Sequence, residues 1–312
     1  MKLSICTDVY ANLSFTEMLD KVKSLGIEAV EMTAGGWGSC AHVNTPELLD
    51  SEEKRKEFLG EIASRGLEIA ALNCSCNQLW PAGEGPQWSE SMYKCAELAG
   101  KLGVKKIVCM SGLPPANEHD TTPNWITSHA DQPYFLKDAV EYEWKVAVEW
   151  WKKFAAHCEA QGIEKIAIEE FPHMLVYNVE TLLKLRDAVG PIIGINLDPS
   201  HLMIIGAEPI ASARALKGCI YHVHGKDARI EKGESDINGI CDWKEVFVPA
   251  ERAWNYVAVG CGKDLQWWKE FFSVVRMMGY NDYVSLEMED QTMSVEAGVQ
   301  TSVDALKQTL SR

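Results

Sequence analysis

The feature that most constrains the fold is a pattern that recurs along the chain. A helical stretch ends at a glycine, and a short apolar run follows at once. Glycine closes helices in the left-handed conformation, and a continuous apolar run suits a strand buried on both faces. Together with the apolar run at residues 2–6, the seven repeats predict eight strands. The repeats begin at Gly26, Gly66, Gly103, Gly162, Gly190, Gly218 and Gly279.

Helical patterns alternate with these strands. Apolar residues recur at three-to-four spacing in four stretches, residues 46–65, 88–102, 139–161 and 262–278. Thr45 is the expected N-cap of the first helix, with Pro46 at its first position. Alternating strands and helices imply a parallel sheet. Eight such units predict the α/β class and a (β/α)8 TIM barrel, one domain over residues 1–312. A doubly wound open sheet is the alternative, but no GxGxxG follows the first strand.

Composition limits the kinds of partner. The net charge is −15 over 312 residues and no run of Lys or Arg occurs, which disfavours nucleic acid and anionic membranes. No window approaches the roughly 18–20 apolar residues of a membrane span, and the start of the chain lacks the apolar core of a signal peptide. The ten cysteines include no CxxC pair. We therefore expect reduced, mostly buried thiols and a cytoplasmic protein.

Two connections between the predicted elements are long, residues 111–138 and residues 225–261. Both follow strands, so we expect both to lie over the C-terminal mouth of the barrel, where TIM-barrel sites are built. Aromatic residues expected above this mouth are Trp80, Trp88, Trp125, Tyr134, Phe135, Trp243, Trp254 and Tyr256. They either form the walls of a site for a flat ligand, or pack the loops and a partner subunit.

Acidic and imidazole side chains stand where strands end. Glu169, Asp198, His224 and Glu287 close four successive strands, whose carboxyl ends meet at one mouth in a barrel. Three carboxylates and one imidazole suit a divalent cation, for which Mn²⁺ is expected and Mg²⁺, Co²⁺ and Zn²⁺ are alternatives. The cation would also offset the repulsion between clustered acids. His222 shares a face with His224, and His224 is preferred because it lies nearer the strand end.

Three segments carry a family resemblance: NLDPSHL, YHVHGKDAR and VSLEMED, at residues 196–202, 221–229 and 284–290. They resemble strands of the sugar phosphate isomerase/epimerase superfamily, the xylose-isomerase-like TIM barrels, which include ketose 3-epimerases and inosose dehydratase. A narrower resemblance, to the catalytic alpha subunits of bacterial C-glycoside deglycosidases, rests on four further segments. These are PNW, VYN, AWNYVAVGCGKDLQWW and EMEDQTMS, at residues 123–125, 176–178, 253–268 and 287–294.

The resemblance implies a role for each matching position. It makes Glu169, Asp198, His224 and Glu287 the metal ligands, and makes the two glutamates also the catalytic acid/base pair. It makes His201 a residue that binds substrate and assists catalysis beside the metal.

Other positions complete the candidate site. Lys226 and Arg229 match polar contacts to substrate, and Glu31 and Asn77, near the ends of the second and third strands, are further substrate-binding candidates. The chain departs from the family pattern at two places. In EEFPH the histidine after the fifth strand comes later than in the family, at His173, and Met288 stands where the family often has histidine. His173 is therefore the candidate replacement for proton transfer.

The chemistry expected from this site begins with one shared step. A divalent ion polarises a sugar carbonyl while a nearby base removes the adjacent proton, giving an enediolate. The leading hypothesis is elimination of an aromatic aglycone from a 3-oxo-C-glycoside, by a catalytic subunit that the resemblance pairs with a small beta subunit in a hetero-oligomer. The alternative is a keto-sugar isomerase, epimerase or inosose-type dehydratase. A DNA-repair endonuclease would need a basic face, and a non-catalytic sugar-binding protein would not need the full ligand set.

Overall fold

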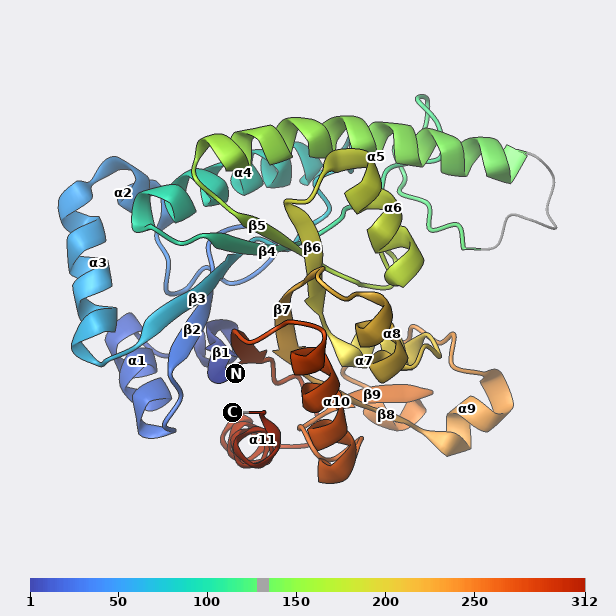
Figure 1. Ribbon diagram of the computed structural model, residues 1–312. Helices are drawn as coiled ribbons and strands as arrows, with labels where there is room; N and C mark the ends of the chain where they lie inside the picture. The colour runs from blue at the N-terminus through green and yellow to red at the C-terminus, as the bar shows by residue number, and fades with distance from the viewer. Residues whose placement is uncertain (128–134, 312) are drawn as a thin grey trace. The chain divides into compact units, whose positions relative to one another are not determined.

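The computed structural model describes residues 1–127 and 135–311, with Phe135 described by its backbone only. Eight parallel strands close into a barrel in the order β1-β10-β7-β6-β5-β4-β3-β2 (Figure 1). The fold is a (β/α)8 TIM barrel, so the predicted class is confirmed and the open-sheet alternative is wrong. The barrel strands are β1 (Lys2–Cys6), β2 (Ala29–Thr33), β3 (Glu68–Asn73), β4 (Lys106–Met110), β5 (Lys165–Glu169), β6 (Ile193–Leu197), β7 (Ile220–Gly225) and β10 (Tyr283–Leu286).

The glycines of the repeat have positive φ, although Gly190, with φ 136° and ψ 174°, lies outside the predicted left-handed region. All seven glycines of the repeat have positive φ, from 66° at Gly26 to 136° at Gly190. Side chains with a Cβ avoid this region, whereas glycine does not. At Gly103 the residue closes its helix in the left-handed conformation, and the N–H of Val104 then donates to the carbonyl of Ala99 at 2.9 Å. The turn thereby leads directly into the next strand.

The helices alternate with the barrel strands, as expected. They are α1 (Phe15–Ser24), α2 (Thr45–Asp50), α3 (Glu52–Ser64), α4 (Gly85–Leu102), α5 (Phe135–Ala160), α6 (Val179–Val189), α7 (Pro199–Ile204), α8 (Pro209–Ala215), α9 (Lys232–Asn238), α10 (Leu265–Met277) and α11 (Val295–Thr309), with short 3-10 turns at Thr7–Tyr10 and Pro249–Glu251.

The start of the predicted helix over residues 46–65 needs a correction. Asn44, not Thr45, is the N-cap, because its side chain accepts a hydrogen bond from the N–H of Glu47. The Thr45 hydroxyl instead donates to the carbonyl of Ala34 at 2.7 Å. The predicted single helix is also two helices, α2 and α3, because Ser51 between them is extended, with φ −115° and ψ 116°.

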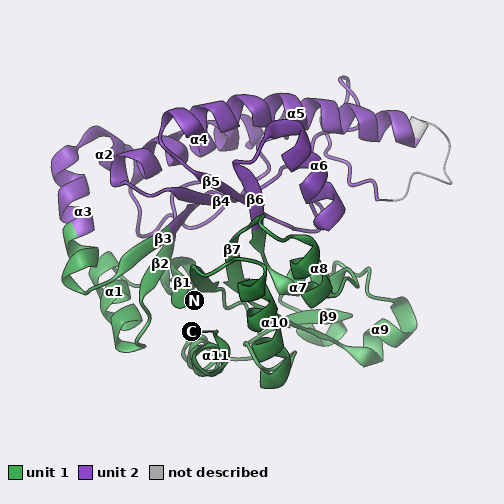
Figure 2. Cartoon of the chain, viewed as in Figure 1, with its two compact units in different colours: residues 1–31, 60–70, 196–312 green, residues 32–59, 71–195 purple. Residues whose placement is uncertain are grey.

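The chain divides into two compact units, which we describe separately (Figure 2). Unit 1 comprises residues 1–31, 60–70 and 196–312. Within it β1 pairs with β2 and with β10, and β10 pairs with β7, all in parallel. The connection after β7 holds an antiparallel hairpin that the sequence analysis did not predict, β8 (Asp227–Ile230) with β9 (Trp254–Val257).

Unit 2 comprises residues 32–59 and 71–195. Within it β4 pairs in parallel with β3 and β5, and α4, α5 and α6 belong to the same unit. The long helix α5 buries Trp151 and Phe154 completely, and the indole N–H of Trp151 donates to the carbonyl of Ser111 at 3.0 Å. This bond holds the chain just beyond the end of β4.

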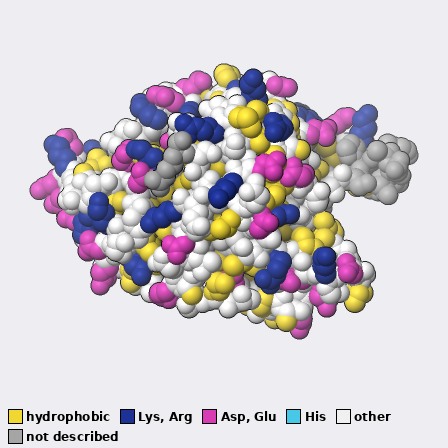
Figure 3. All heavy atoms as spheres, turned by 60° about the horizontal axis from the view of Figure 1, so that its bottom comes forward, with side chains coloured by type: hydrophobic (Ala, Val, Ile, Leu, Met, Phe, Trp, Pro, Cys, Tyr) yellow, Lys and Arg dark blue, Asp and Glu magenta, His cyan; other side chains and the backbone are white. Residues whose placement is uncertain are grey.

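Several sequence predictions concern the chain as a whole. All ten cysteines are free thiols, and five of them are buried. Among the described helices, none combines the length and apolar character that crossing a bilayer requires. On the face drawn in Figure 3, Lys and Arg side chains are interspersed with Asp and Glu.

Candidate metal centre

Asp198 follows β6 directly, and its two carboxylate oxygens have different partners. Oδ1 accepts hydrogen bonds from the backbone N–H of Ser200 at 2.8 Å and from its hydroxyl at 2.6 Å, so Asp198 is the N-cap of α7. Pro199 occupies the first helical position, where its missing N–H costs nothing. Oδ2 faces the other way, toward His201 and His224. The side chain is fully buried.

The ring of His224, near the end of β7, brings two carboxylates together. Its Nδ1 lies 3.5 Å from Asp198 Oδ2 and 3.3 Å from Glu287 Oε2. Glu287 follows the last residue of β10, and β10 pairs with β7 in parallel. The neighbouring strand ends therefore point an imidazole and two carboxylates at one place.

This arrangement fits a divalent cation. The ligand atoms of Asp198, His224 and Glu287 all lie within 4.8 Å of one another. Nitrogen and oxygen ligands held about 2.0–2.1 Å from a tetrahedral zinc ion are themselves about 3.3–3.4 Å apart. The two distances at His224 Nδ1 match this spacing. Carboxylate and imidazole ligands suit zinc, manganese and cobalt alike.

The electrostatics also favour a cation. Burial opposes ionisation of Asp198, but the charge of His201 and the hydrogen bond with His224 hold the pKa of Asp198 below its usual value. Partial burial likewise opposes ionisation of Glu287, but the Lys226 ammonium and His224 hold its pKa well below the usual range. Both groups are ionised at neutral pH, so a bound cation would not have to displace protons from them.

Lys226 is a buried amine at the edge of this cluster. Its Nζ lies 2.9 Å from Glu287 Oε2 and 2.6 Å from Glu289 Oε2. It also lies 4.2 Å from the centre of the Tyr256 ring. Burial lowers the pKa of Lys226, but the charges of Glu287 and Glu289 outweigh it and raise that pKa well above its usual value. The site thus presents a fixed positive charge beside the carboxylates.

His201 lies on α7, three residues beyond Asp198, and is fully buried. Its Nε2 faces Asp198 Oδ2 at 3.5 Å, and its Nδ1 pairs with the Tyr256 hydroxyl at 2.9 Å. Sequence reasoning assigned Tyr256 only to an aromatic wall. Its hydroxyl was not predictable as a partner of His201, because it comes from the unpredicted hairpin strand β9.

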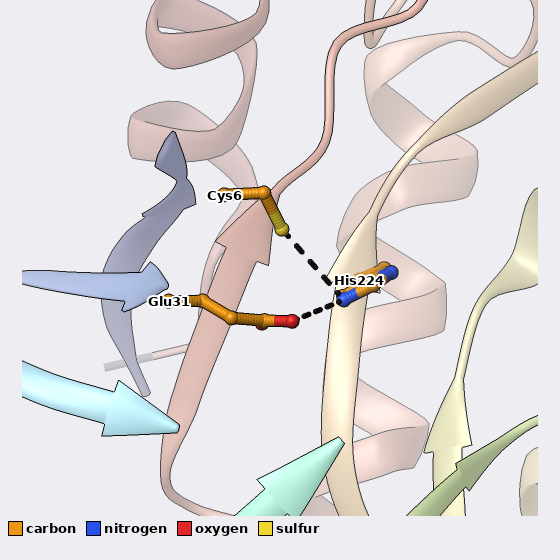
Figure 4. Close-up of side chains that lie close together, drawn as sticks. All are labelled: Cys6, Glu31 and His224. Carbon is orange, nitrogen blue, oxygen red and sulfur yellow. Dashed lines mark hydrogen bonds and ion pairs between the residues drawn. The ribbon is translucent and has the colours of Figure 1, made fainter. Parts of the chain in front are cut away.

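The other ring nitrogen of His224 faces a different set of groups (Figure 4). Its Nε2 lies 3.3 Å from Glu31 Oε1 and 3.8 Å from the Cys6 sulfur. The second oxygen of Glu31 lies 2.7 Å from His222 Nε2, which is 2.9 Å from the Ser285 hydroxyl. Burial opposes ionisation of Glu31, but His224 and His222 hold its pKa well below the usual range. Both histidines therefore face Glu31, and His224 also faces the carboxylates of Asp198 and Glu287 through Nδ1.

The candidates in unit 2 occupy three places. Glu169 is the buried last residue of β5, and Glu170 after it is fully buried. His173 has a positive φ of 68°, packs edge-to-face on Trp125 at 4.8 Å, and has its pKa lowered by burial. Asn77 uses its amide to donate to the Leu113 carbonyl and to accept from its N–H. That pair of bonds holds the loop after β4.

Arg229 lies in β8, where its guanidinium donates to Glu231 Oε1 at 2.7 Å. It lines a surface hollow with Gly206 and Glu208 rather than the cluster around His224. The substrate contact expected of it stays a prediction.

The predicted aromatic wall is largely packed into the loops. Trp254 is buried against Met203, Ala228 and Ala253, and Trp243 packs edge-to-face on it at 5.4 Å. Trp80 and Trp88 pack on each other at 6.0 Å, and Trp125 packs on Tyr177 at 5.4 Å. Tyr134 lies outside the described residues, as does the side chain of Phe135. These contacts favour the loop-packing alternative for the tryptophans.

Residues 19–309 match the family described as xylose isomerase-like TIM barrel. The chain therefore belongs to the xylose isomerase-like TIM barrel family. It is 56% identical over 313 residues to the uncharacterized protein YfiH of Bacillus subtilis strain 168, and the match covers 100% of each chain.

Two solved structures share the fold. One is the probable 3-DHS dehydratase AsbF from Bacillus anthracis, with a TM-score of 0.70, 20% identity, and coverage of 98% of this chain and 99% of that chain. The other is the IolI protein with a bound zinc atom, with a TM-score of 0.68, 20% identity and full coverage of both chains. The family assignment thus agrees with the superfamily resemblance of the sequence.

Proposed function

We propose that the chain is a divalent-metal-dependent enzyme that removes the proton beside the carbonyl of a keto-sugar or a similar polyhydroxylated ketone. The observation that carries this proposal is the convergence of Asp198, His224 and Glu287, with the Lys226 ammonium beside them. Two comparisons support it: one structure of the same fold binds zinc, and another is named a probable dehydratase.

We include Glu169 as the fourth ligand. It is buried at the end of β5, and β5 neighbours β6 in the strand order of the barrel. Three carboxylates and one imidazole form a set rich in oxygen, which favours Mn²⁺. The zinc in the IolI structure makes Zn²⁺ the second candidate.

The proposed mechanism assigns work to residues of this chain. When bound, the cation would polarise a carbonyl as a Lewis acid. The Lys226 ammonium is placed to stabilise negative charge that develops on a substrate oxygen. His201, with the Tyr256 hydroxyl on its Nδ1 and Asp198 Oδ2 3.5 Å from its Nε2, is proposed to bind substrate beside the cation. Glu169 and Glu287 are proposed as the pair that removes and returns the proton.

Two fates of the deprotonated substrate are favoured. Returning the proton to another carbon or to the opposite face gives an isomerase or epimerase, and loss of a hydroxyl beta to the carbonyl gives a dehydratase. We place these ahead of aglycone elimination. Neither solved structure named above is a C-glycoside deglycosidase, so that narrower reading, its aromatic aglycone and its small beta subunit rest on the sequence resemblance.

Proton exchange with solvent tests the shared step before the substrate is known. The protein is stripped with a chelator, reloaded with Mn²⁺ or Zn²⁺, and incubated in D2O with ketoses, inososes, 3-dehydroshikimate and a 3-oxo-C-glucoside. NMR then follows deuterium entering the carbon beside the carbonyl. We expect metal-dependent exchange with at least one ketone, absent in Asp198→Asn.

The reaction products distinguish between the possible reactions of the deprotonated substrate. A rearranged sugar or a dehydrated ring supports the favoured reading, whereas free aglycone would restore the deglycosidase. Lack of exchange with every ketone by a protein that binds metal would overturn the proposed function.

A further inference from the structure

We infer that Glu31 positions His224 for metal binding: its carboxylate accepts a hydrogen bond from the N–H at Nε2 and so leaves Nδ1 to bind the cation. The inference rests on the proposed metal site, and it gives Glu31 a task different from the substrate contact expected from the sequence. It concerns a residue that reaches the metal only through another side chain.

The two ring nitrogens of His224 face different groups, and Figure 4 shows Glu31 and Cys6 on the Nε2 side. On the Nδ1 side stand two carboxylate oxygens, from Asp198 and Glu287. On the Nε2 side stand Glu31 Oε1 at 3.3 Å, the Asn196 amide nitrogen Nδ2 at 3.1 Å and the Cys6 sulfur at 3.8 Å. The amide can present its oxygen to the ring, because nitrogen and oxygen are assigned from their hydrogen bonds.

With the Asn196 oxygen turned toward the ring, every group near Nε2 can accept a hydrogen bond, so once a cation occupies the Nδ1 side the proton of His224 belongs on Nε2. A neutral imidazole carries one N–H, so Nδ1 is left with its lone pair free for a cation. Histidine ligands in proteins commonly donate their other N–H to a carboxylate, which fixes the tautomer and the ring orientation.

Glu31 is itself held rigidly. It is fully buried, and its other oxygen lies 2.7 Å from His222, which contacts Ser285 at 2.9 Å. Ser285 is the register partner of His224 across β10 and β7. The chain of contacts thus starts and ends on neighbouring strands, so the ring plane of His224 is set by the barrel itself.

The same figure contains a rival site. Cys6, Glu31 and His224 also offer three ligand atoms within 4.8 Å of one another. That site would use Nε2 of His224, whereas the proposed centre uses Nδ1. We assign the cation to the Nδ1 side because the carboxylates of Asp198 and Glu287 meet there. The other oxygen of Glu31 already contacts His222.

The test measures metal affinity rather than turnover. Glu31→Gln removes the negative acceptor with little change in shape, and Cys6→Ser is the matched control on the same nitrogen. We expect Glu31→Gln to weaken Zn²⁺ and Co²⁺ binding about 10–100-fold in a competition assay with a chromophoric chelator. Cys6→Ser should change it less than about threefold.

A second measurement uses the unmodified protein and does not depend on whether a variant folds. Nitrogen-15 NMR of the histidine rings should place a proton on Nε2 of His224 and a zinc-induced shift on Nδ1. Unchanged affinity in Glu31→Gln, or a zinc-induced shift on Nε2, would overturn the inference. A thiolate-to-cobalt charge-transfer band that Cys6→Ser abolishes would do so as well.

The outcomes also separate this inference from the proposed function. If the metal binds through Nδ1 and Glu31→Gln weakens its affinity, but no ketone exchanges its proton, the inference stands and the proposed activity does not. Proton exchange with unaltered metal affinity in Glu31→Gln would do the reverse.

Discussion

Two buried aspartates each follow one of two neighbouring barrel strands. Their positions in the sequence are similar, but their carboxylates have different hydrogen-bond partners. Asp227, just beyond β7, accepts backbone N–H bonds from Ala228, Gly260, Gly262 and Lys263 and one indole N–H from Trp268. Asp198, just beyond β6, gives one oxygen to a helix N-terminus and turns the other toward two histidines.

The two carboxylates differ in how many hydrogen bonds they accept from the protein. The carboxylate of Asp227 is saturated by donors of the protein, and it closes the loop between the hairpin and α10. That closure is tight: a Cβ on Gly262 would lie 2.2 Å from the Ala228 carbonyl oxygen. Asp198 Oδ2 is instead directed at groups that could share a cation with it. An acid used for structure has all its lone pairs occupied, whereas a site acid keeps one side for a ligand.

Glu143 on α5 extends the comparison to a third kind of buried acid. It is 1% exposed, and its Oε1 has no hydrogen-bond partner among the described residues. Burial raises its pKa to about 8. Glu143 therefore stays protonated in the folded protein at neutral pH, unlike Asp198.

The largest expected effect is that of Asp198→Asn. Asparagine keeps the helix cap but removes the negative charge from the proposed ligand. We expect metal-dependent proton exchange to fall at least about a thousandfold, or ~4 kcal/mol, and the free energy of unfolding of the metal-free protein to change by less than about 1 kcal/mol. NMR exchange rates and urea unfolding measure the two quantities.

The matched control is Ser200→Ala, which removes a hydroxyl from the other oxygen of the same carboxylate. It should keep proton exchange within about threefold of the unmodified protein. If Asp198→Asn retained a tenth of the exchange, Asp198 would belong with Asp227 as a structural acid.

Asp227→Asn should act on stability instead. An amide cannot accept at both ends, so several donors lose their partner, and we expect the free energy of unfolding to fall by about 3 kcal/mol. Metal affinity should stay within about threefold, because the residues that donate to Asp227 are not among the proposed ligands. Urea unfolding and a chelator competition check this pair of results. A large loss of metal affinity at preserved stability would reverse the comparison.

Glu143→Gln should stabilise the protein at about pH 6 and above. The folded carboxyl has a raised pKa near 8, and the unfolded one ionises near about 4.3. Stability is therefore lost as pH rises between these values, because only the unfolded state releases its proton. The variant should be more stable by roughly 2 kcal/mol at pH 6, by more at higher pH, and nearly equal to the parent at pH 4. Urea unfolding at both pH values measures this, and equal stabilities at pH 6 would contradict it.

The smallest expected effect is that of Tyr256→Phe. The ring under Lys226 remains, but His201 loses the hydroxyl on its Nδ1. We expect proton exchange to slow about tenfold, or ~1.4 kcal/mol, with metal affinity unchanged. Titration calorimetry with Zn²⁺ provides the second reading. If metal affinity fell as much as proton exchange, Tyr256 would act by stabilising the metal site rather than by orienting His201 toward the substrate.

The fold was predictable because two local signals agree. A glycine that must adopt positive φ and a run of apolar residues locate seven of the eight barrel strands, and the apolar run alone locates β1. The β8–β9 hairpin was missed because β8 begins one residue after β7 ends, with only Lys226 between them. Nothing in the sequence separates two strands so closely spaced.

The site was predictable only in part. Strand ends pointed to Asp198, His224 and Glu287, and the structure brings their ligand atoms together. Periodicity places His222 and His224 on one face, and only nearness to the strand end favoured His224; the contact of His222 with Glu31 from β2 was not predicted. The Tyr256 hydroxyl meets a histidine 55 positions earlier in the chain, a distance over which sequence spacing carries no information. The catalytic roles of all these residues stay predictions.

The divided carboxylate of Asp198 also limits what evolution or a designer could place at this position. Asparagine and serine preserve the turn but lose the charge, and glutamate keeps the charge but shifts both oxygens by one methylene. In a saturation library scored once for folding and once for activity, position 198 should therefore accept several residues in the first screen and a single residue in the second.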